Sequence, residues 1–141
     1  MFENLVGQTL DRYQVLNLLG EDELGAVFRA HDPTLQRDVA IKVLSAEVTA
    51  RPDFPDRFVQ VARTAARLDH PNLVQVFDFH GSSSLHYLVM EYIPGATLEK
   101  MLASLRRSGR WMLLGEAVHL VRQLALAMEY VRSQGAPQRA L

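Results

Sequence analysis

A change in the spacing of apolar residues at Asp56 constrains the fold of this chain most strongly. Before Asp56, short apolar runs are separated by turn residues, which is typical of strands. From Asp56 to Leu68, apolar residues recur every three or four positions, which predicts a helix that ends at Asp69-His70-Pro71. Two strand-like runs and two helical segments follow. This order predicts an α+β fold, a five-stranded antiparallel sheet with one packed helix and two further helices.

The boundaries of these elements follow from local signals. The strands are expected at Tyr13–Leu19, Ala26–Ala30, Asp38–Leu44, Leu73–Phe79 and His86–Tyr92. Pro52 and Pro55 are expected to bound a loop before the first helix. Thr97 is expected to cap a helix that runs to about Arg107. The last helix, 114–133, is apolar on most sides. Such a helix is normally buried on most sides, and most of that cover is expected to be missing from these 141 residues.

Composition excludes several classes of function. The 141 residues suffice for one domain, and the net charge of −1 gives no general attraction to nucleic acid or to an anionic membrane. The absence of cysteine excludes disulfides, and the five scattered histidines predict no metal site. The first 13 residues do not have the pattern of a signal peptide, and no run of about 20 apolar residues predicts a membrane span. A cytoplasmic protein is therefore expected.

Several short motifs occur in a fixed order, and together they carry a family resemblance. They are Leu19-Gly20, Gly25-Ala26-Val27, Val39-Ala40-Ile41-Lys42, Arg57-Phe58, Ala65-Ala66-Arg67-Leu68, His70-Pro71-Asn72-Leu73-Val74 and Leu88-Val89-Met90-Glu91-Tyr92. From about Gly7 onward the chain resembles the bacterial eukaryotic-type (Hanks-type) Ser/Thr protein kinases.

The resemblance implies a domain organisation. Residues 1–93 correspond to the N-lobe of a kinase, 94–96 to the hinge, and 97–141 to the start of the C-lobe, ending before the metal-binding segment. The chain is then either a piece of a longer protein or a natural half-kinase.

The resemblance also assigns a nucleotide site. Gly20 and Gly25 correspond to the first and third glycines of the phosphate-covering loop, and Lys42 to the lysine that pairs with the α- and β-phosphates. The apolar positions around the purine are Leu19, Val27, Ala40 and the gatekeeper Met90. The two hinge positions are Glu91 and Ile93. All of the apolar positions are also ordinary core positions of such a sheet.

Two positions of this site depart from the pattern of active relatives. Asp22 stands where the loop has its middle glycine and, with Glu21 and Glu23, places negative charge where phosphates would lie. It is otherwise a solvated acidic hairpin tip. Val61 stands nine residues before His70, where active relatives carry the glutamate that holds the lysine. A valine there serves simple core packing.

Lys42 therefore needs another partner. Glu47 is the nearest upstream acid, but it is expected in a loop. Asp22 is the better candidate.

The catalytic loop departs as well. Ser133–Leu141 aligns without a gap with the family's S-x-G-x-x-H-R-D-L, so that Gln138 replaces the histidine and Ala140 the catalytic aspartate. No catalytic residue is therefore assigned.

These departures predict a catalytically inactive kinase-like domain, a pseudokinase, that acts as a binding or regulatory module in bacterial signalling. The alternatives are the ATP-binding lobe of an active Ser/Thr kinase and a nucleotide sensor without phosphoryl transfer. No cofactor is required, and ATP binding is weak at most. The partner is an unidentified protein, and the 114–133 helix is expected to form a homodimer. Arg106, Arg107 and Arg110 form a basic cluster that is better explained as a solvated helix end than as a phosphate site.

Overall fold

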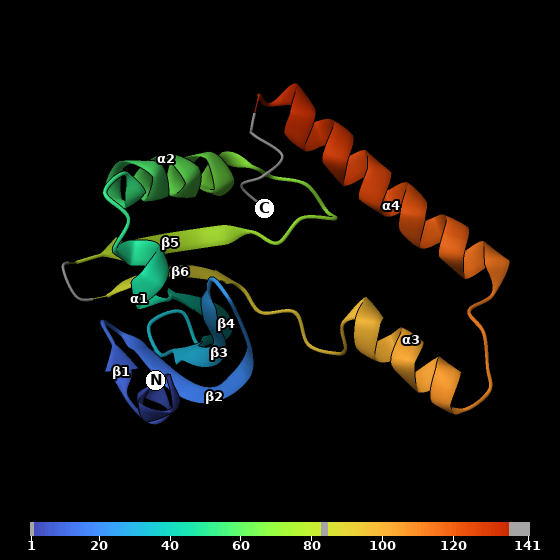
Figure 1. The fold of residues 1–141 in the computed structure, drawn as a ribbon, viewed down its shortest axis with the longest axis horizontal. Helices are drawn as coiled ribbons and strands as arrows, with labels where there is room; N and C mark the ends of the chain where they lie inside the picture. The colour runs from blue at the N-terminus through green and yellow to red at the C-terminus, as the bar shows by residue number, and fades with distance from the viewer. Residues whose placement is uncertain (1, 83–84, 136–141) are drawn as a thin grey trace.

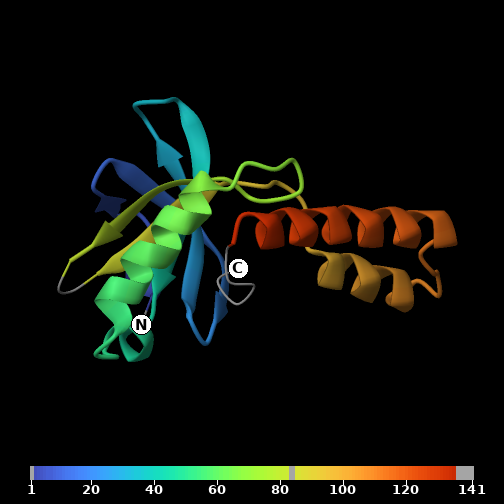
Figure 2. The same ribbon diagram turned by 90° about the horizontal axis from the view of Figure 1, so that it is seen from above.

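The computed structural model describes residues 2–82 and 85–135. In this part of the chain a curled antiparallel sheet and the helix α2 form one body, and α3 and α4 extend from it (Figures 1 and 2). The strands are β1 (Thr9–Leu10), β2 (Tyr13–Asp22), β3 (Gly25–Asp32), β4 (Arg37–Leu44), β5 (Val76–Gly81) and β6 (His86–Glu91). The helices are a 3-10 turn at Glu3–Leu5, α1 (Ala46–Thr49), α2 (Phe54–Arg67), α3 (Leu98–Arg107) and α4 (Leu114–Ser133).

The predicted α+β fold is confirmed, with one additional strand. The described strands form a single sheet in the order β1-β2-β3-β4-β6-β5, and all neighbours are antiparallel. The five predicted strands correspond to β2–β6. The sixth, β1, has two residues and pairs with the start of β2 through a turn at Asp11, whose φ is 52°. A strand of two residues is too short to show the alternation that sequence prediction relies on.

The core lies on one face of the sheet, as the period of two in β3 and β4 requires. Phe28 pairs with Ile41, which pairs with Val89, and all three side chains are buried. The other buried members of this cluster are Leu10, Tyr13, Val15, Ala26, Ala30, Val39, Val43 and Tyr87. The alternate residues of β3, β4 and β6 therefore share the opposite face, and the candidate site is built on that face.

Helix α2 packs against β5 through its aromatic residues. Phe54 and Phe58 are buried, and the Phe58 ring meets the Phe79 ring edge-on with 5.9 Å between centroids. The helix begins two residues before its predicted start, and Pro55 lies in its first turn, not in a loop. Proline is tolerated there because the first amide groups of a helix have no partner within it.

The two C-terminal helices have nearly their predicted boundaries. The Thr97 hydroxyl accepts a hydrogen bond from the Lys100 amide at 3.2 Å, so the predicted cap of α3 is confirmed. The C-terminal half of α4 is anchored, since the Tyr130 hydroxyl accepts from the Asp69 amide at 3.1 Å and Val131 is buried beside Leu68.

The rest of α4 projects away from the sheet (Figure 2). Of its residues, only Ala127 and Val131 are buried, so most of this apolar helix is without cover, as expected. None of the helices in the described ranges is both long enough and apolar enough to cross a membrane.

Candidate nucleotide site

The hairpin between β2 and β3 is closed by a carboxylate. Asp22 pairs with Gly25 across a two-residue loop, Glu23 and Leu24. One oxygen of the carboxylate, Oδ1, accepts hydrogen bonds from the backbone N–H of Leu24 at 2.9 Å and of Gly25 at 3.0 Å. Asp residues commonly satisfy nearby amides in this way, which stabilises a tight turn. The Asp22 side chain thus uses the two backbone donors at the loop tip.

Gly25 is required by the backbone geometry of the hairpin. Its φ is +150°, and a Cβ atom at this position would lie 1.9 Å from the carbonyl oxygen of Val43 on β4. No side chain fits that space. Gly20 differs, because a Cβ atom there would meet no atom within 4 Å. Of the two predicted loop glycines, Gly25 therefore holds β3 against β4, while Gly20 lies open.

Lys42 lies on the face of the sheet opposite the core. It pairs with Val27 on one side and Leu88 on the other, and its side chain is 21% exposed. Its Nζ donates to the second oxygen of the Asp22 carboxylate, Oδ2, at 3.0 Å. The prediction that Asp22 substitutes as the partner of Lys42 is confirmed.

The pKa of Asp22 reflects these contacts. The hydrogen bond from Lys42 lowers the pKa below that of a free aspartate, and the amides of Leu24 and Gly25 lower it further, against a smaller effect of burial. The side chain is half exposed, so it is an ionised and partly solvated carboxylate held by three donors.

Helix α2 offers no carboxylate at the position where an active relative carries one. Val61 is half-buried, and the only acidic residue of α2 is Asp56, in its first turn. Glu47 is exposed and lies in the one-turn helix α1, which Ser45 caps, and not in the expected loop. Among the described residues, the carboxylate that pairs with Lys42 comes from Asp22 in the β2–β3 hairpin and not from a helix.

The predicted purine-facing residues share one face of the sheet. Val27 pairs with Lys42, and Ala40 lies two residues before Lys42 and pairs with Met90, so the four side chains project from the same face. Ala40 is buried, Val27 and Met90 are half-buried, and Leu19 is 39% exposed. The structure thus brings together the apolar positions and the lysine, with Leu19 at the edge.

The hinge positions lie at the end of β6. The Glu91 amide donates to the carbonyl of Gln75 at 2.9 Å, and the Glu91 side chain accepts from the Gln75 amide at 3.3 Å. Ile93 is 58% exposed. The backbone of Ile93 forms no hydrogen bond within residues 2–82 and 85–135, so it remains open to a ligand. Gln138 and Ala140 lie outside the described residues.

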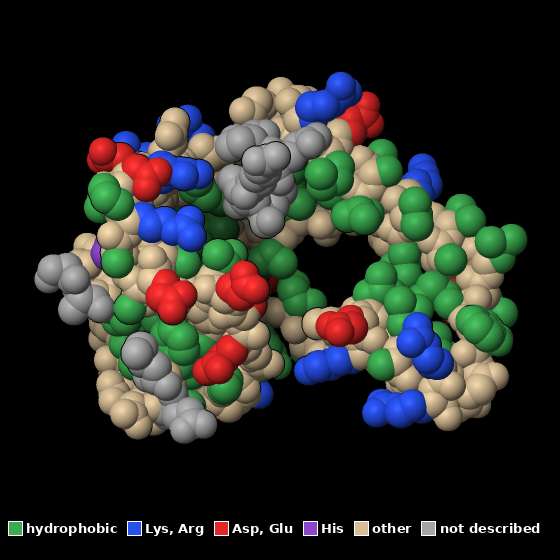
Figure 3. Space-filling model, viewed as in Figure 1, with side chains coloured by type: hydrophobic (Ala, Val, Ile, Leu, Met, Phe, Trp, Pro, Cys, Tyr) green, Lys and Arg blue, Asp and Glu red, His purple; other side chains and the backbone are tan. Residues whose placement is uncertain are grey.

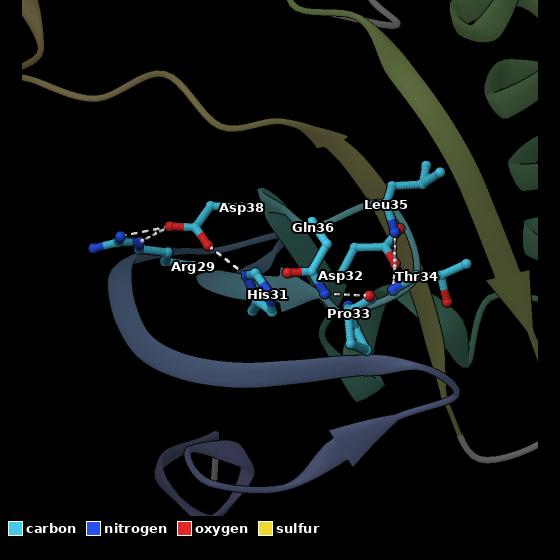
Figure 4. A network of polar contacts seen from close by, with 8 residues as sticks. All are labelled: Arg29, His31, Asp32, Pro33, Thr34, Leu35, Gln36 and Asp38. Atoms are coloured by element: carbon cyan, nitrogen blue, oxygen red, sulfur yellow. Dashed lines mark hydrogen bonds and ion pairs between the residues drawn. The ribbon is translucent and has the colours of Figure 1, made fainter.

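Sequence reasoning missed a polar network at the β3–β4 turn, shown in Figure 4. The Asp32 side chain is buried and accepts from the amides of Thr34 at 3.0 Å and Leu35 at 3.2 Å. Burial alone would raise the pKa of Asp32, but these amides and Arg12 outweigh it and lower the pKa. In the sequence, Asp32 before Pro33 indicates a turn but not this network. The network shapes the turn that aligns β4, which carries Lys42.

Neighbouring charges add to this network. The Asp38 carboxylate accepts a hydrogen bond from Arg29 Nε at 2.8 Å, and its other oxygen lies 3.0 Å from His31 Nδ1. The Arg29 guanidinium also lies 5.1 Å from the centre of the Tyr92 ring. These contacts link β3 and β4 to the chain just after β6.

Comparison with known proteins decides the family. A family model described as protein tyrosine and serine/threonine kinase matches residues 13–141. The chain belongs to this protein kinase family. It is 36% identical over 140 residues to the serine/threonine-protein kinase PknA of Mycobacterium tuberculosis, covering 95% of this chain and 32% of PknA. It is 37% identical over 101 residues to PrkC of Bacillus subtilis, covering 71% of this chain and 16% of PrkC.

Solved structures agree with this assignment. The crystal structure of the PknI kinase domain of M. tuberculosis superposes with a TM-score of 0.80 at 29% identity, covering 92% of this chain and 51% of that domain. The kinase-like chain thus spans about half of a solved kinase domain and at most a third of these two curated relatives. The predicted resemblance to bacterial Ser/Thr kinases is confirmed.

Proposed function

We propose that this kinase-like domain does not transfer phosphoryl groups and acts as a binding or regulatory module in bacterial signalling. The observation that carries the proposal is the partner of Lys42. In active kinases a glutamate of the packed helix holds this lysine in register with the phosphates. Here a carboxylate from the β2–β3 hairpin holds it at 3.0 Å, and α2 presents Val61 instead of an acid.

Electrostatics support the same conclusion. Asp22, Glu21 and Glu23 are adjacent and exposed, so the loop that would cover a nucleotide carries three acidic residues. Two like charges about 4 Å apart repel by about 4 kcal/mol at an effective dielectric constant of 20. A triphosphate that binds Lys42 must therefore either displace the Asp22 carboxylate from the lysine or bind next to this negative charge.

The sequence of the catalytic loop adds a second, separate reason. Phosphoryl transfer by kinases uses an aspartate that orients the substrate hydroxyl and accepts its proton. Ala140 stands at that place in the alignment, and alanine has no atom that can accept a proton.

Phosphoryl transfer from radiolabelled ATP tests the proposal. The purified chain, and the protein that carries it, are incubated with ATP, magnesium or manganese, and a generic basic protein substrate. We expect no more label than with the Lys42→Ala variant. Label transfer that depends on Lys42 would show that the domain is an active kinase and would refute the proposal.

A second candidate function is nucleotide sensing without turnover. It is favoured by the retained apolar positions Val27, Ala40 and Met90, which share the face of Lys42, and by the open backbone of Ile93. Thermal-shift titration with adenosine separates this function from a purely protein-binding module, because only a sensor gains stability in proportion to ligand occupancy.

We also propose that α4 pairs with the same helix of a second copy. Figure 3 shows hydrophobic side chains gathered on the surface over α3 and α4. Leu114, Val118, Val121 and Leu124 of α4 are 81%, 58%, 66% and 63% exposed. The spacing of these residues places them on one stripe without a charged residue in its middle. An apolar stripe is complementary to itself, as a two-fold contact requires, and exposed area of this kind favours association.

A further inference from the structure

We propose that Asp22 is a specificity-determining residue, a resident substitute for a phosphate group that makes the site around Lys42 select against polyphosphate ligands. The inference rests on the proposed function, because it explains how a kinase-like site that retains the lysine and the apolar residues beside it rejects ATP. The ligands that Asp22 would exclude are nucleoside triphosphates and inorganic polyphosphates, which share the chemistry of adjacent phosphate oxygens.

Three donors converge on one carboxylate. Oδ1 accepts from the amides of Leu24 and Gly25, and Oδ2 accepts from the ammonium of Lys42. Consecutive backbone amides together with a lysine are the donor set that proteins use to bind phosphate oxygens. In this chain the set is complete, and an anion belonging to the chain itself already fills it.

The occupant is fixed in place by the sheet. Gly25 lies tight against Val43, so the amide at the hairpin tip cannot turn away without moving β4. Lys42 is on β4 and pairs with Val27 on β3, two residues after Gly25. The carboxylate is therefore held between two strands that are themselves paired from Gly25 to Asp32.

The neighbouring acids do not share this role. The side chains of Glu21 and Glu23 are exposed and form no hydrogen bond or ion pair within the described residues, whereas Asp22 receives three. Glu23 takes part in the hairpin only through its backbone carbonyl, which accepts from the Ser45 hydroxyl at 3.4 Å. Removing the charge of Glu23 thus changes the local field but leaves the donor set occupied.

Equilibrium binding of sodium tripolyphosphate and of ATP, without metal, tests the inference on the full chain by isothermal titration calorimetry. Asp22→Gly frees all three donors. Asp22→Asn keeps an oxygen that can accept from the two amides, so the hairpin stays closed, but it removes the negative charge that pairs with Lys42. We expect both variants to bind both probes about tenfold or more tightly than the natural chain. Glu23→Gln, the matched control that removes one charge at the next position, should gain much less.

Two results would overturn the inference. One is no gain for either Asp22 variant when circular dichroism shows that both are folded. The other is an equal gain for Glu23→Gln, which would mean that net charge and not the donor set governs binding. Adding Lys42→Ala to Asp22→Gly should remove the gain. These outcomes are distinct from failure of the proposed function, because binding without turnover is measured here, and label transfer by the natural chain would refute inactivity whatever Asp22 does.

Discussion

Gly25→Ala should destabilise the folded chain by about 3 kcal/mol or more, the largest effect that we expect from a single methyl group in this protein. The added Cβ would lie 1.9 Å from the carbonyl oxygen of Val43, 2.9 Å from its carbonyl carbon and 3.0 Å from the Cα of Leu44, and none of these backbone atoms can move aside as a flexible side chain would. The φ of +150° adds strain for any residue with a side chain. The first register pairs between β3 and β4 must therefore separate, and the Asp22 contacts with the Gly25 amide are lost with them.

Urea unfolding followed by circular dichroism measures this effect. Gly20→Ala is the matched control, because it adds the same methyl group to the same hairpin where no atom lies within 4 Å. We expect its free energy of unfolding to change by no more than about 0.5 kcal/mol. Equal losses for the two variants would show that Gly25 is not under the steric constraint described here.

Leu124→Glu should abolish the self-association that we propose for α4. Leu124 lies in the middle of the exposed apolar stripe of α4, and a two-fold contact through that stripe would bury one new carboxylate from each copy. Burying an unpaired charge costs several kcal/mol, so the dissociation constant should rise about 100-fold or more.

Sedimentation equilibrium over a range of protein concentrations measures the association. Leu126→Glu is the control, since it makes the same substitution in the same helix, two residues away and so on a different side, at a position that is 42% exposed. It should leave the association unchanged. A natural chain that stays monomeric at high concentration, or a matching loss for both variants, would contradict the proposed role of α4.

Much of the fold could be predicted because its signals are local. The β-branched run of β4, the cap at Thr97 and the apolar repeat of α4 each depend on residues within a few positions of one another. The errors have equally physical causes. β1 exists only because β2 provides a partner. Pro52 and Pro55 together indicate a loop, although the first turn of a helix accepts a proline such as Pro55.

The candidate site divides in the same way. Counting from His70 was enough to expect Val61 in place of an acid, and the described residues of α2 indeed offer none there. The double role of Asp22 was only partly predictable. Its contact with Lys42 spans 20 positions and depends on how closely Gly25 approaches Val43, which no local pattern encodes. The buried network at Asp32 depends likewise on Arg12, which lies 20 positions earlier in the turn between β1 and β2.

The pairing of Asp22 with Lys42 is tested most directly by titrating the Asp22 carboxyl carbon by NMR in the natural chain and in Lys42→Met. The hydrogen bond from Lys42 lowers the pKa of Asp22 in the folded chain. The contact therefore stabilises the fold fully at a pH above the pKa of the unfolded chain, about 3.9. This stabilisation is lost as the pH falls through the lower pKa of the folded chain. We predict a pKa below that of a free aspartate in the natural chain and a rise toward the ordinary value in Lys42→Met. An ordinary pKa for Asp22 that the substitution leaves unchanged would contradict the pairing, and with it the main reason to regard this kinase-like site as closed to phosphates.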